Sequence, residues 1–335
     1  MSRPVLSVHG LTTTFAGRDW FEALSDIGFE VCRGEVFAIL GESGCGKSVT
    51  ALSILRLAGP TARVEGAVEL GGANLLSLSE PEMRSVRGGR ISMVMQNPFS
   101  ALNPAIQVGD QIAEVIRAHA SAQDAAAFGR RSLLRRERRN GEVWRRAVAL
   151  LEQVGIPDAA NAANRWPHEL SGGMCQRVVI AIALACEPEL LIADEPTTAL
   201  DVTVQREIVA LLDRIRRERD TGILLISHDF ALIGEFANRV AVLYAGQIME
   251  MGEVDDLMSK PRHPYTSLLL QCVPDLGHDR ELATIPGTVP HRYDRISGCR
   301  FHDRCPKAVD ACRTAPQDLR ELEEGHLVRC HLATA

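Results

Sequence analysis

The sequence has few aromatic residues and no long apolar run. Aromatic residues make up 4% of the 335 residues, so the core must rely on aliphatic side chains, and a nucleic-acid surface of stacked aromatic rings is not expected. The longest apolar run, 178–186, has nine residues, whereas a membrane-spanning helix needs about 20. The first ten residues contain no apolar segment of the secretory type. We therefore expect a chain of the reducing cytosol without a membrane span of its own.

The sequence also lacks an excess of basic residues and a disulfide-type pattern of cysteines. Its net charge is −6, which disfavours a broad surface for nucleic acid, and no nucleic-acid partner is expected. The nine cysteines are too few and too scattered for a small disulfide scaffold, so we expect thiols or metal ligands. Four of the nine lie within the last 37 residues, which makes that segment a candidate metal site.

Apolar runs and turn signals predict an α/β fold of about two domains. Residues 36–40, 190–193 and 223–227 are apolar runs of strand length, and 48–59 and 203–219 have helical periodicity. Strands that alternate with helices predict a mostly parallel sheet with crossover helices. Helical periodicity also dominates the middle of the chain, which predicts an inserted subdomain. Further elements are expected as strands at 5–8, 27–31, 63–70 and 90–95, as helices within 105–190, and as a hairpin and helix at 240–258.

An arginine-rich segment interrupts this helical region. Residues 130–146 contain eight arginines and two glutamates. We interpret the segment as a solvated linker or helix face. Contact with anionic lipid headgroups or with an acidic partner is the alternative.

Residues 41–48 (GESGCGKS), called the P-loop below, fit the pattern G-x-x-x-x-G-K-[ST] between an apolar strand and a helix. Its backbone N–H groups can surround phosphate oxygens at a helix N-terminus. Lys47 is expected to reach the β- and γ-phosphates of a nucleotide, and the Ser48 hydroxyl to ligate Mg²⁺. The predicted nucleotide-contacting residues here are Gly41, Ser43, Gly44, Cys45, Gly46, Lys47, Ser48 and Val49.

A second segment, 190–195 (LLIADE), ends an apolar strand with two carboxylates. Asp194 suits the Mg²⁺ role in phosphoryl transfer. Glu195 can polarise the attacking water as a general base. A simple charged turn before Pro196 is the alternative.

A third segment, 170–174 (LSGGM), called the signature loop below, precedes a helical pattern over 177–186. Ser171, Gly172 and Gly173 at a helix start form a second anion site. One γ-phosphate does not need two such sites from one chain. A dimer that holds the nucleotide between the P-loop of one subunit and the signature loop of the other uses both.

These motifs, in this order, resemble the ATP-binding subunits of ABC transporters over about residues 5–255. The family also has a glutamine loop, matched at Gln96, a D-loop, matched at 199–201, and a switch histidine, matched at His228. The resemblance implies that Glu195 is the catalytic base and that His228 contacts the γ-phosphate. It implies that Gln96 couples Mg²⁺ and the attacking water to the membrane partner, and that Asp201 communicates across the dimer.

The resemblance also implies an architecture and an adenine-stacking aromatic. The expected cassette spans 1–258, with a RecA-like core, an antiparallel β subdomain and a helical subdomain at about 100–185. Phe15 is the expected stacking residue; Trp20 and Phe21 are alternatives, and each ring can also be core. Cys45 lies inside the P-loop and Cys175 directly follows the signature loop, so we expect alkylation to block hydrolysis and ATP to protect Cys45.

The C-terminal extension, 259–335, contains four clustered cysteines. Four thiolates in a short loop-rich tail predict a tetrahedral all-thiolate metal site that supplies folding energy. Their spacing matches neither the C-x2-C zinc pattern nor the ferredoxin run. The residues alone therefore leave three alternatives for this site: zinc, an iron–sulfur cluster, or unliganded thiols. His302, His326 and His331 lie close in the sequence and are candidate substitute ligands. The predicted ligands are Cys299, Cys305, Cys312 and Cys330.

The segments 261–266 (PRHPYT) and 91–104 (ISMVMQNPFSALNP) resemble the dipeptide/oligopeptide branch of the ABC importers. That branch implies a 4Fe–4S cluster on the four cysteines. It implies an ATPase at the cytoplasmic face of the bacterial inner membrane that energises peptide import. The expected partners are two transmembrane permease subunits docked near 96–117, a second and non-identical ATPase subunit, and indirectly a substrate-binding protein.

Two alternatives to peptide import stay open. Nickel, an opine or glutathione are cargoes within the same branch, and an ATPase does not contact its cargo. A soluble ABC-type ATPase acting on ribosomes or DNA is less consistent with one cassette, no heptad tract and a net acidic charge.

Overall fold

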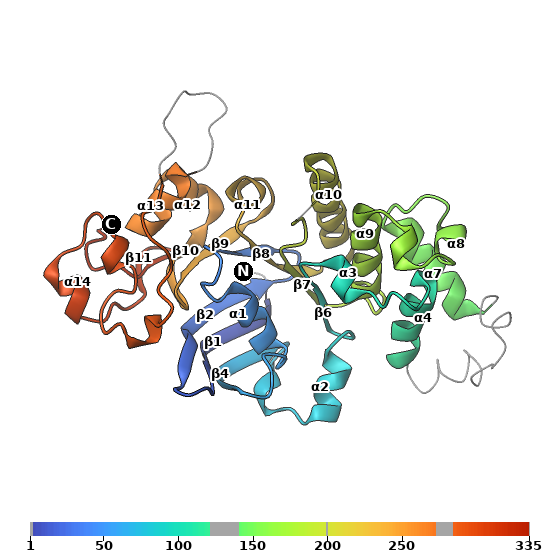
Figure 1. The fold of residues 1–335 in the computed structure, drawn as a ribbon, viewed down its shortest axis with the longest axis horizontal. Helices are drawn as coiled ribbons and strands as arrows, with labels where there is room; N and C mark the ends of the chain where they lie inside the picture. The colour runs from blue at the N-terminus through green and yellow to red at the C-terminus, as the bar shows by residue number, and fades with distance from the viewer. Residues whose placement is uncertain (1–2, 121–140, 199, 273–283, 335) are drawn as a thin grey trace. The chain divides into compact units, whose positions relative to one another are not determined.

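The computed structural model describes the chain except residues 1–2, 121–140, 199, 273–283 and 335. The chain forms two compact units (Figure 1). The first unit combines Met1–Leu78 with Gly222–Ala335, and the second is Ser79–Thr221. Each unit is described separately below.

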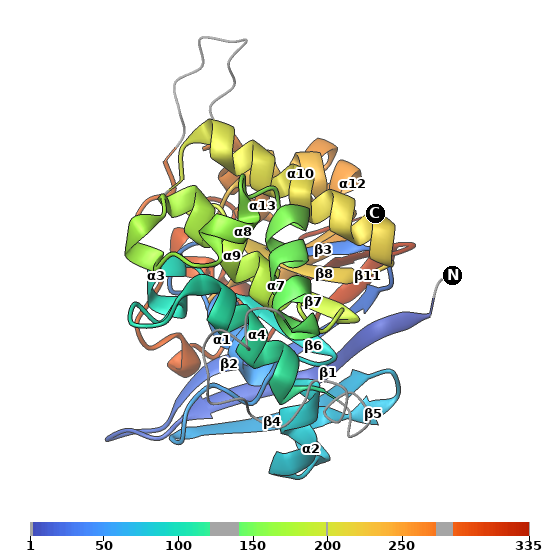
Figure 2. The same ribbon diagram turned by 90° about the vertical axis from the view of Figure 1, so that its right-hand side faces the viewer.

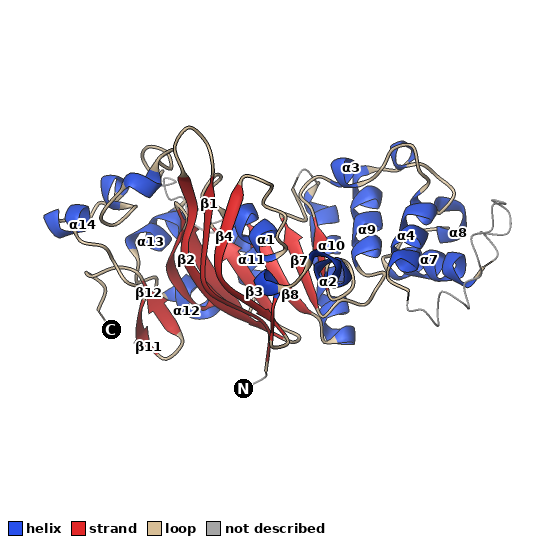
Figure 3. Ribbon diagram, turned by 90° about the horizontal axis from the view of Figure 1, so that it is seen from below, coloured by secondary structure: helices blue, strands red, loops and turns tan. Residues whose placement is uncertain are grey.

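An antiparallel sheet opens the first unit, with strand order β2-β1-β4-β5. Figure 3 shows β2, β1 and β4 of this sheet side by side. β1 pairs with both β2 and β4. The strands predicted at 5–8 and 27–31 are each part of a strand of 12 residues. The bounds are Pro4–Phe15 for β1, Phe21–Cys32 for β2, Ala62–Leu70 for β4 and Ala73–Asn74 for β5. The antiparallel β subdomain implied by the resemblance is therefore present.

The second sheet of this unit is centred on β3, whose five residues are all buried. β3 pairs in parallel with β8 and with β9, as the apolar runs predict. β10 then pairs antiparallel with β9, and β12 of the C-terminal extension pairs with β10. The bounds are Val36–Leu40 for β3, Gly222–Ser227 for β8, Arg239–Tyr244 for β9, Gln247–Glu253 for β10, Arg320–Glu323 for β11 and His326–Val328 for β12. The extension thus continues a sheet of the cassette.

Short helices complete the first unit. The longest of them, α1 and α13, have eight residues each. The α-helices are α1 (Lys47–Ile54), α11 (Phe230–Phe236), α12 (Val254–Ser259), α13 (Pro264–Gln271) and α14 (Asp310–Thr314), and the 3-10 helices are η1 (Leu75–Ser77), η3 (Tyr293–Arg295) and η4 (His302–Arg304).

The second unit is mostly helical, as the periodicity over 105–190 predicts (Figure 2). Among the described residues of this unit, the strands β6 and β7 are parallel, and β7 is entirely buried. α4 and α7 bury apolar residues at helical spacing, such as Val108 and Ile112 on α4 and Ala147 and Leu151 on α7. The bounds are α2 Glu80–Val86, β6 Ile91–Val94, α3 Pro98–Ala101, α4 Val108–Ala118, α7 Glu142–Gln153, α8 Ala159–Ala162, η2 Pro167–Glu169, α9 Gly172–Ala183, β7 Leu190–Asp194 and α10 Val202–Arg219.

Two sequence predictions in this unit concern the start of helix α9 and the arginine-rich segment. Helix α9 begins at Gly172 and not at 177 as predicted, because Ser171 caps it and the signature glycines form its first turn. Most of the arginine-rich segment, 130–140, lies outside the described residues. Among the residues that are described, none of the helices has the length and apolar character to cross a bilayer.

Candidate functional site

The P-loop follows β3 directly and ends where helix α1 begins at Lys47. Gly44 and Gly46 have φ angles of +80° and +109°, in the left-handed region that favours glycine. A Cβ on Gly41 would lie 2.2 Å from the carbonyl oxygen of Leu243, and one on Gly46 would lie 2.8 Å from Leu24. The glycines of the motif are therefore required by the packing of the loop as well as by its backbone angles.

Lys47 is buried within this loop. Its Nζ donates hydrogen bonds to the carbonyl oxygens of Gly41 at 2.8 Å and Glu42 at 3.1 Å. Ser48, the next residue, is exposed on the first turn of α1. The cation thus lies inside the turn of the loop and the hydroxyl lies at its surface. This arrangement suits a lysine that meets phosphate and a serine that meets a metal ion.

The expected reactivity of Cys45 and Cys175 is contradicted by their burial. Both side chains are fully buried. Burial raises the pKa of the Cys45 thiol to about 11, against the opposing effect of the nearby Lys47 ammonium. Burial also raises the pKa of Cys175, whose Sγ donates to the carbonyl oxygen of Pro167 at 3.3 Å. Neither thiol has the exposure or the thiolate character of a reactive cysteine.

His228 also belongs to the first unit and lies directly after β8. β3 and β8 are parallel neighbours in which Leu40 pairs with Ser227, so both chain segments leave the sheet at the same edge. The P-loop and His228 therefore lie at adjacent strand ends, the usual place for a ligand in an α/β sheet. Their positions in the sequence are 180 residues apart, and only the strand pairing brings them together.

In the second unit, Gln96 and Glu195 meet across adjacent strand ends. Gln96 Nε2 donates to Glu195 Oε2 at 2.7 Å, and Thr198 Oγ1 donates to the same oxygen at 2.9 Å. Asp194 is buried at the end of β7. Glu195 has a φ of +47°, an uncommon conformation for a residue with a side chain, of the kind found at functional sites. The sequence did not predict a role for Thr198, because nothing in the sequence around a threonine in a turn indicates which residue its hydroxyl will contact.

The signature loop and the D-loop each supply a helix cap in the second unit. Ser171 Oγ accepts a hydrogen bond from Met174 N–H at 3.3 Å, at the start of α9. Asp201 accepts one from Val204 N–H at 3.0 Å, at the start of α10. A Cβ on Gly173 would lie 2.8 Å from Val204 Cγ1, so the two helix starts pack closely there. Residue 199 of the D-loop lies outside the described residues.

The three candidate stacking aromatics differ in their surroundings. Phe15 is half-buried at the end of β1, opposite Phe21 in the β1–β2 register. Phe21 packs edge-on against Tyr293 with ring centroids 5.0 Å apart, so its ring is occupied by a core contact. Trp20 is 59% exposed. Trp20 is thus the most exposed of the three rings, and Phe15 and Phe21 are both half-buried.

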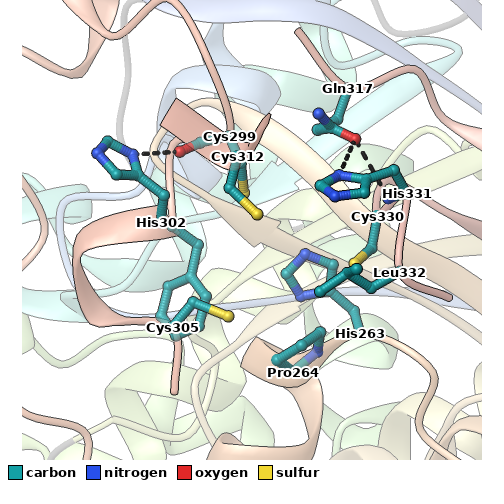
Figure 4. Close-up of a pocket in the computed structure, with 11 residues that line it drawn as sticks. His263, Pro264, Cys299, His302, Cys305, Cys312, Gln317, Cys330, His331 and Leu332 are labelled. Atoms are coloured by element: carbon teal, nitrogen blue, oxygen red, sulfur yellow. Dashed lines mark hydrogen bonds between the residues drawn. The ribbon is translucent and has the colours of Figure 1, made fainter. Parts of the chain in front are cut away.

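Four cysteines of the C-terminal extension, Cys299, Cys305, Cys312 and Cys330, line one pocket (Figure 4). In the close-up their sulfur atoms point toward a common space. Burial, with smaller contributions from the other three thiols, raises the pKa of Cys299 to about 11. Within the described ranges, no group of three or more His, Cys, Asp or Glu side chains could hold a metal ion as arranged. The cysteines are thus brought together, and the donor set is entirely sulfur.

The neighbouring histidines have other partners. His302 Nδ1 lies 2.7 Å from the carbonyl oxygen of Cys299, and His331 Nδ1 lies 2.9 Å from Gln317 Oε1. His326 does not line the pocket, and its Nε2 lies 2.8 Å from Glu250 Oε1. His263 does line it, although sequence reasoning missed this residue, and burial lowers its pKa to about 3. His263 is therefore neutral at physiological pH.

Comparison with known proteins agrees with this geometry. The family described as ABC transporter matches residues 24–198, and the family described as oligopeptide/dipeptide transporter, C-terminal region, matches 249–312. The chain is 44% identical over 313 residues to the dipeptide transport ATP-binding protein DppD of Escherichia coli, covering 93% of this chain and 91% of that protein. It is 45% identical to the probable peptide ABC transporter ATP-binding protein y4tR of Sinorhizobium fredii, covering 97% and 94%.

A solved structure has a similar fold. The dimeric post-hydrolysis state of the ATP-binding cassette MJ0796 bound to ADP and Pi matches with a TM-score of 0.62 and 27% identity, over 74% of this chain and 98% of that chain. The family matches and the sequence identities agree with the geometry of the P-loop, the signature loop and the strand ends. The chain therefore belongs to the ABC transporter family, as an ATPase cassette with a C-terminal region of the oligopeptide/dipeptide transporter type.

Proposed function

We propose that this chain hydrolyses ATP to energise the import of di- or oligopeptides by a membrane transporter. The proposal rests on the observation that a single chain contains both an ABC cassette and a C-terminal region of the oligopeptide/dipeptide transporter type. Identity of 44% to a dipeptide transport ATP-binding protein over nearly the whole chain supports the peptide cargo. The cassette spans 1–258 and the C-terminal extension 259–335.

Two of these chains, or one with a related subunit, would enclose ATP. The P-loop of one subunit would hold the phosphates through its backbone N–H groups and Lys47, and the signature loop of the other would cap the γ-phosphate. Phe15 would stack on adenine, and Asp201 would respond to the partner subunit. The predicted contacts to ATP are Phe15, Gly41, Ser43, Gly44, Cys45, Gly46, Lys47, Ser48, Val49, Ser171, Gly172, Gly173 and Asp201.

The Mg²⁺ site would use Ser48, Gln96 and Asp194. A hydroxyl, an amide oxygen and a carboxylate are hard oxygen donors of the kind that Mg²⁺ prefers. When bound, Mg²⁺ offsets the charge on the β- and γ-phosphates. The fit of these side-chain types supports the assignment that the family resemblance implies.

Hydrolysis would transfer the γ-phosphoryl group to water. The water oxygen forms the new bond to phosphorus while the bond to the bridging oxygen of ADP breaks, and Glu195 accepts the water proton. The donors Gln96 and Thr198 both contact Oε2 of Glu195 and so hold the orientation of the carboxylate. His228 would orient the γ-phosphate and the base. Catalysis then rests on positioning and electrostatics.

This subunit would be held at the membrane by its partners. Met95 and Phe99 flank Gln96 and are 46% and 54% exposed, which supports docking of this region, near 96–117, onto two permease subunits. The second ATPase subunit is proposed to be non-identical, and a substrate-binding protein would deliver the peptide on the far side. The site of action is then the cytoplasmic face of the bacterial inner membrane.

We also propose a 4Fe–4S cluster on Cys299, Cys305, Cys312 and Cys330. Four sulfurs that share a pocket fit an all-thiolate ligand set. A 4Fe–4S cluster is held by four cysteine thiolates, and the importer branch that the sequence resembles carries such a cluster on its C-terminal extension, which supports the cluster over a single zinc ion. When bound, the cluster would fasten the loops of the extension and supply folding energy.

The function is tested by reconstitution with the permeases and the binding protein in vesicles. ATP-dependent uptake of labelled dipeptides is expected, and Glu195→Gln should abolish uptake while ATP still binds. Uptake of nickel, an opine or glutathione in place of peptide would replace the cargo assignment. Co-purification with ribosomes and not with permeases would contradict the transport role.

The cluster is tested separately by metal analysis of anaerobically purified protein. About four iron and four sulfide per chain, with a brown colour, are expected. Cys305→Ser should lower the iron content. A colourless protein with one zinc would contradict the cluster, and a protein free of both metals would leave the thiols unliganded.

A further inference from the structure

The P-loop is joined to the C-terminal extension by an ion pair that the motif does not predict. Arg304 donates from both terminal nitrogens to the carboxylate of Glu42, at 2.9 Å to Oε1 and 3.0 Å to Oε2. The Arg304 side chain is 6% exposed, and that of Glu42 is 27% exposed. A two-pronged contact of this kind fixes the orientation of both groups as well as attracting them.

Arg304 is itself held in place before it reaches Glu42. Its Nε donates to the carbonyl oxygen of Pro286 at 2.8 Å, and its guanidinium lies over the rings of Tyr244 and Phe301 at 5.6 and 5.9 Å. An arginine restrained on several sides cannot follow a moving partner. Glu42 is therefore the member of the pair whose position is set by the other.

The backbone of Glu42 is held by a second residue of the extension. Its N–H donates to the Tyr265 hydroxyl oxygen at 3.3 Å. Tyr265 is fully buried and packs against Tyr244 and Phe301, with ring centroids 4.7 and 5.0 Å away. Both the side chain and the main chain of one P-loop residue thus depend on residues outside the cassette motifs.

The extension also holds the loop that carries the candidate stacking aromatics. Arg295 pairs with Asp19 at 2.7 Å, and Arg292 donates to the carbonyl oxygen of Trp20 at 3.0 Å. Tyr293 Oη donates to the carbonyl oxygen of Ala23 at 3.1 Å. The extension therefore contacts the loops proposed to meet both ends of ATP, its phosphates and its base.

We propose that the C-terminal extension is a positioning element of the nucleotide site, and that Arg304 and Tyr265 keep the P-loop in its phosphate-binding arrangement through Glu42. Arg304 also neutralises a carboxylate that would otherwise repel the phosphates. Displacement of a binding group by about 1 Å is enough to weaken catalysis strongly. The inference depends on the proposed role of the P-loop in holding ATP.

The test is a double-mutant cycle on ATP binding, with steady-state hydrolysis measured in parallel. We expect Arg304→Gln to raise the ATP dissociation constant and KM roughly tenfold with a smaller change in kcat, and Glu42→Gln to raise them roughly threefold. In the double variant the carboxylate is gone, so the rise should not exceed that of Arg304→Gln alone. Arg304→Lys should recover part of the lost ATP affinity, because lysine keeps the positive charge but cannot make the two parallel hydrogen bonds of a guanidinium.

Two further variants separate this role from general damage. Glu323→Gln removes the partner of Arg262 elsewhere in the extension and should bind ATP as the unmodified chain does. Tyr265→Phe keeps the packed ring and removes only the acceptor, so KM should rise while the thermal unfolding temperature changes little. If Arg304→Gln fails to fold, Glu42→Gln and Tyr265→Phe carry the test.

The possible failures are distinguishable. Lys47→Ala should abolish ATP binding, and its failure to do so would contradict the proposed function. Loss of binding in Lys47→Ala, together with unchanged ATP affinity in Glu42→Gln and Tyr265→Phe, would overturn the positioning role alone. Effects of Arg304→Gln and Glu42→Gln that multiply in the double variant would also overturn it.

Discussion

Gln96 and Glu195 share a hydrogen bond of 2.7 Å between Nε2 and Oε2, although 98 residues separate them in the chain. Both follow parallel strands, β6 and β7, and leave them at the same edge. The glutamine implied to sense the membrane partner is therefore in direct contact with the proposed catalytic base. A movement of Gln96 would change the orientation of the carboxylate that accepts the proton.

Glu195→Gln should remove hydrolysis and retain ATP binding. The amide keeps the shape of the side chain but cannot accept a proton, and general-base catalysis contributes roughly 100- to 10,000-fold. Phosphate release and ATP binding measured on the same preparation check this. Asp229→Asn, outside the proposed catalytic residues, serves as the control. Hydrolysis within twofold of the unmodified rate would contradict the assignment of the base.

Thr198→Val should lower kcat about tenfold, because it removes one donor to the Glu195 carboxylate, and a hydrogen bond to a charged group is worth about 1.5 kcal/mol. KM for ATP should stay nearly constant. Thr198→Ser keeps the hydroxyl and should retain most activity. Equal losses in the valine and serine variants would contradict the prediction, because the serine variant still has the hydroxyl donor.

Gly173→Ala should destabilise the second unit through a clash with Val204. The new Cβ would lie 2.8 Å from Val204 Cγ1, and overpacking of this kind costs about 1–3 kcal/mol. The free energy of unfolding measures the effect. Val204→Ala makes room, so the double variant should regain much of the stability. No recovery in the double variant would show that Val204 is not the cause.

Cys45 should resist alkylation at neutral pH. With a pKa of about 11, roughly one thiol in a thousand is ionised at pH 8, and the thiolate is the reactive form. Its labelling rate should rise about tenfold per pH unit below that pKa, while the more exposed Cys32 labels first. Mass spectrometry of labelled peptides checks this. Labelling of Cys45 as fast as Cys32 at pH 7 would contradict the burial argument.

Glu250→Ala should loosen the C-terminal extension. This buried carboxylate accepts hydrogen bonds from Arg262 N–H at 2.7 Å and His263 N–H at 3.0 Å and lies 2.8 Å from His326 Nε2. Leaving several buried donors without a partner should lower the free energy of unfolding by about 3 kcal/mol or more. Denaturant unfolding measures it, with the exposed Glu253→Ala as the control. A loss below about 1 kcal/mol would contradict an anchoring role.

The sequence predicted the elements whose signal is local. β3, β8 and α10 were predicted within one residue of their ends, because each is a continuous apolar run or a periodic segment with a cap. β1 was predicted at less than half its length, since Gly10 interrupts the apolar pattern. The strand continues there through a register shift, with Gly10 at a φ of +57°.

The same distinction separates the predicted site residues from the missed ones. Lys47, Glu195 and Ser171 belong to motifs with fixed spacing, so a short window of sequence is enough to find them. Thr198 and Arg304 act through partners set by tertiary packing. Arg304 lies 262 residues from Glu42, and no local pattern links them.

The pairing of β12 with β10 has a consequence for solubility. Without β12, the backbone N–H and C=O groups of β10 on that side would form an unpaired strand edge, which is a template for association with other chains. The extension covers this edge with a short hairpin whose outer strand, β11, is mostly exposed and carries charged side chains. A chain truncated before the extension would therefore expose the unpaired edge of β10 and aggregate, whether or not nucleotide is bound.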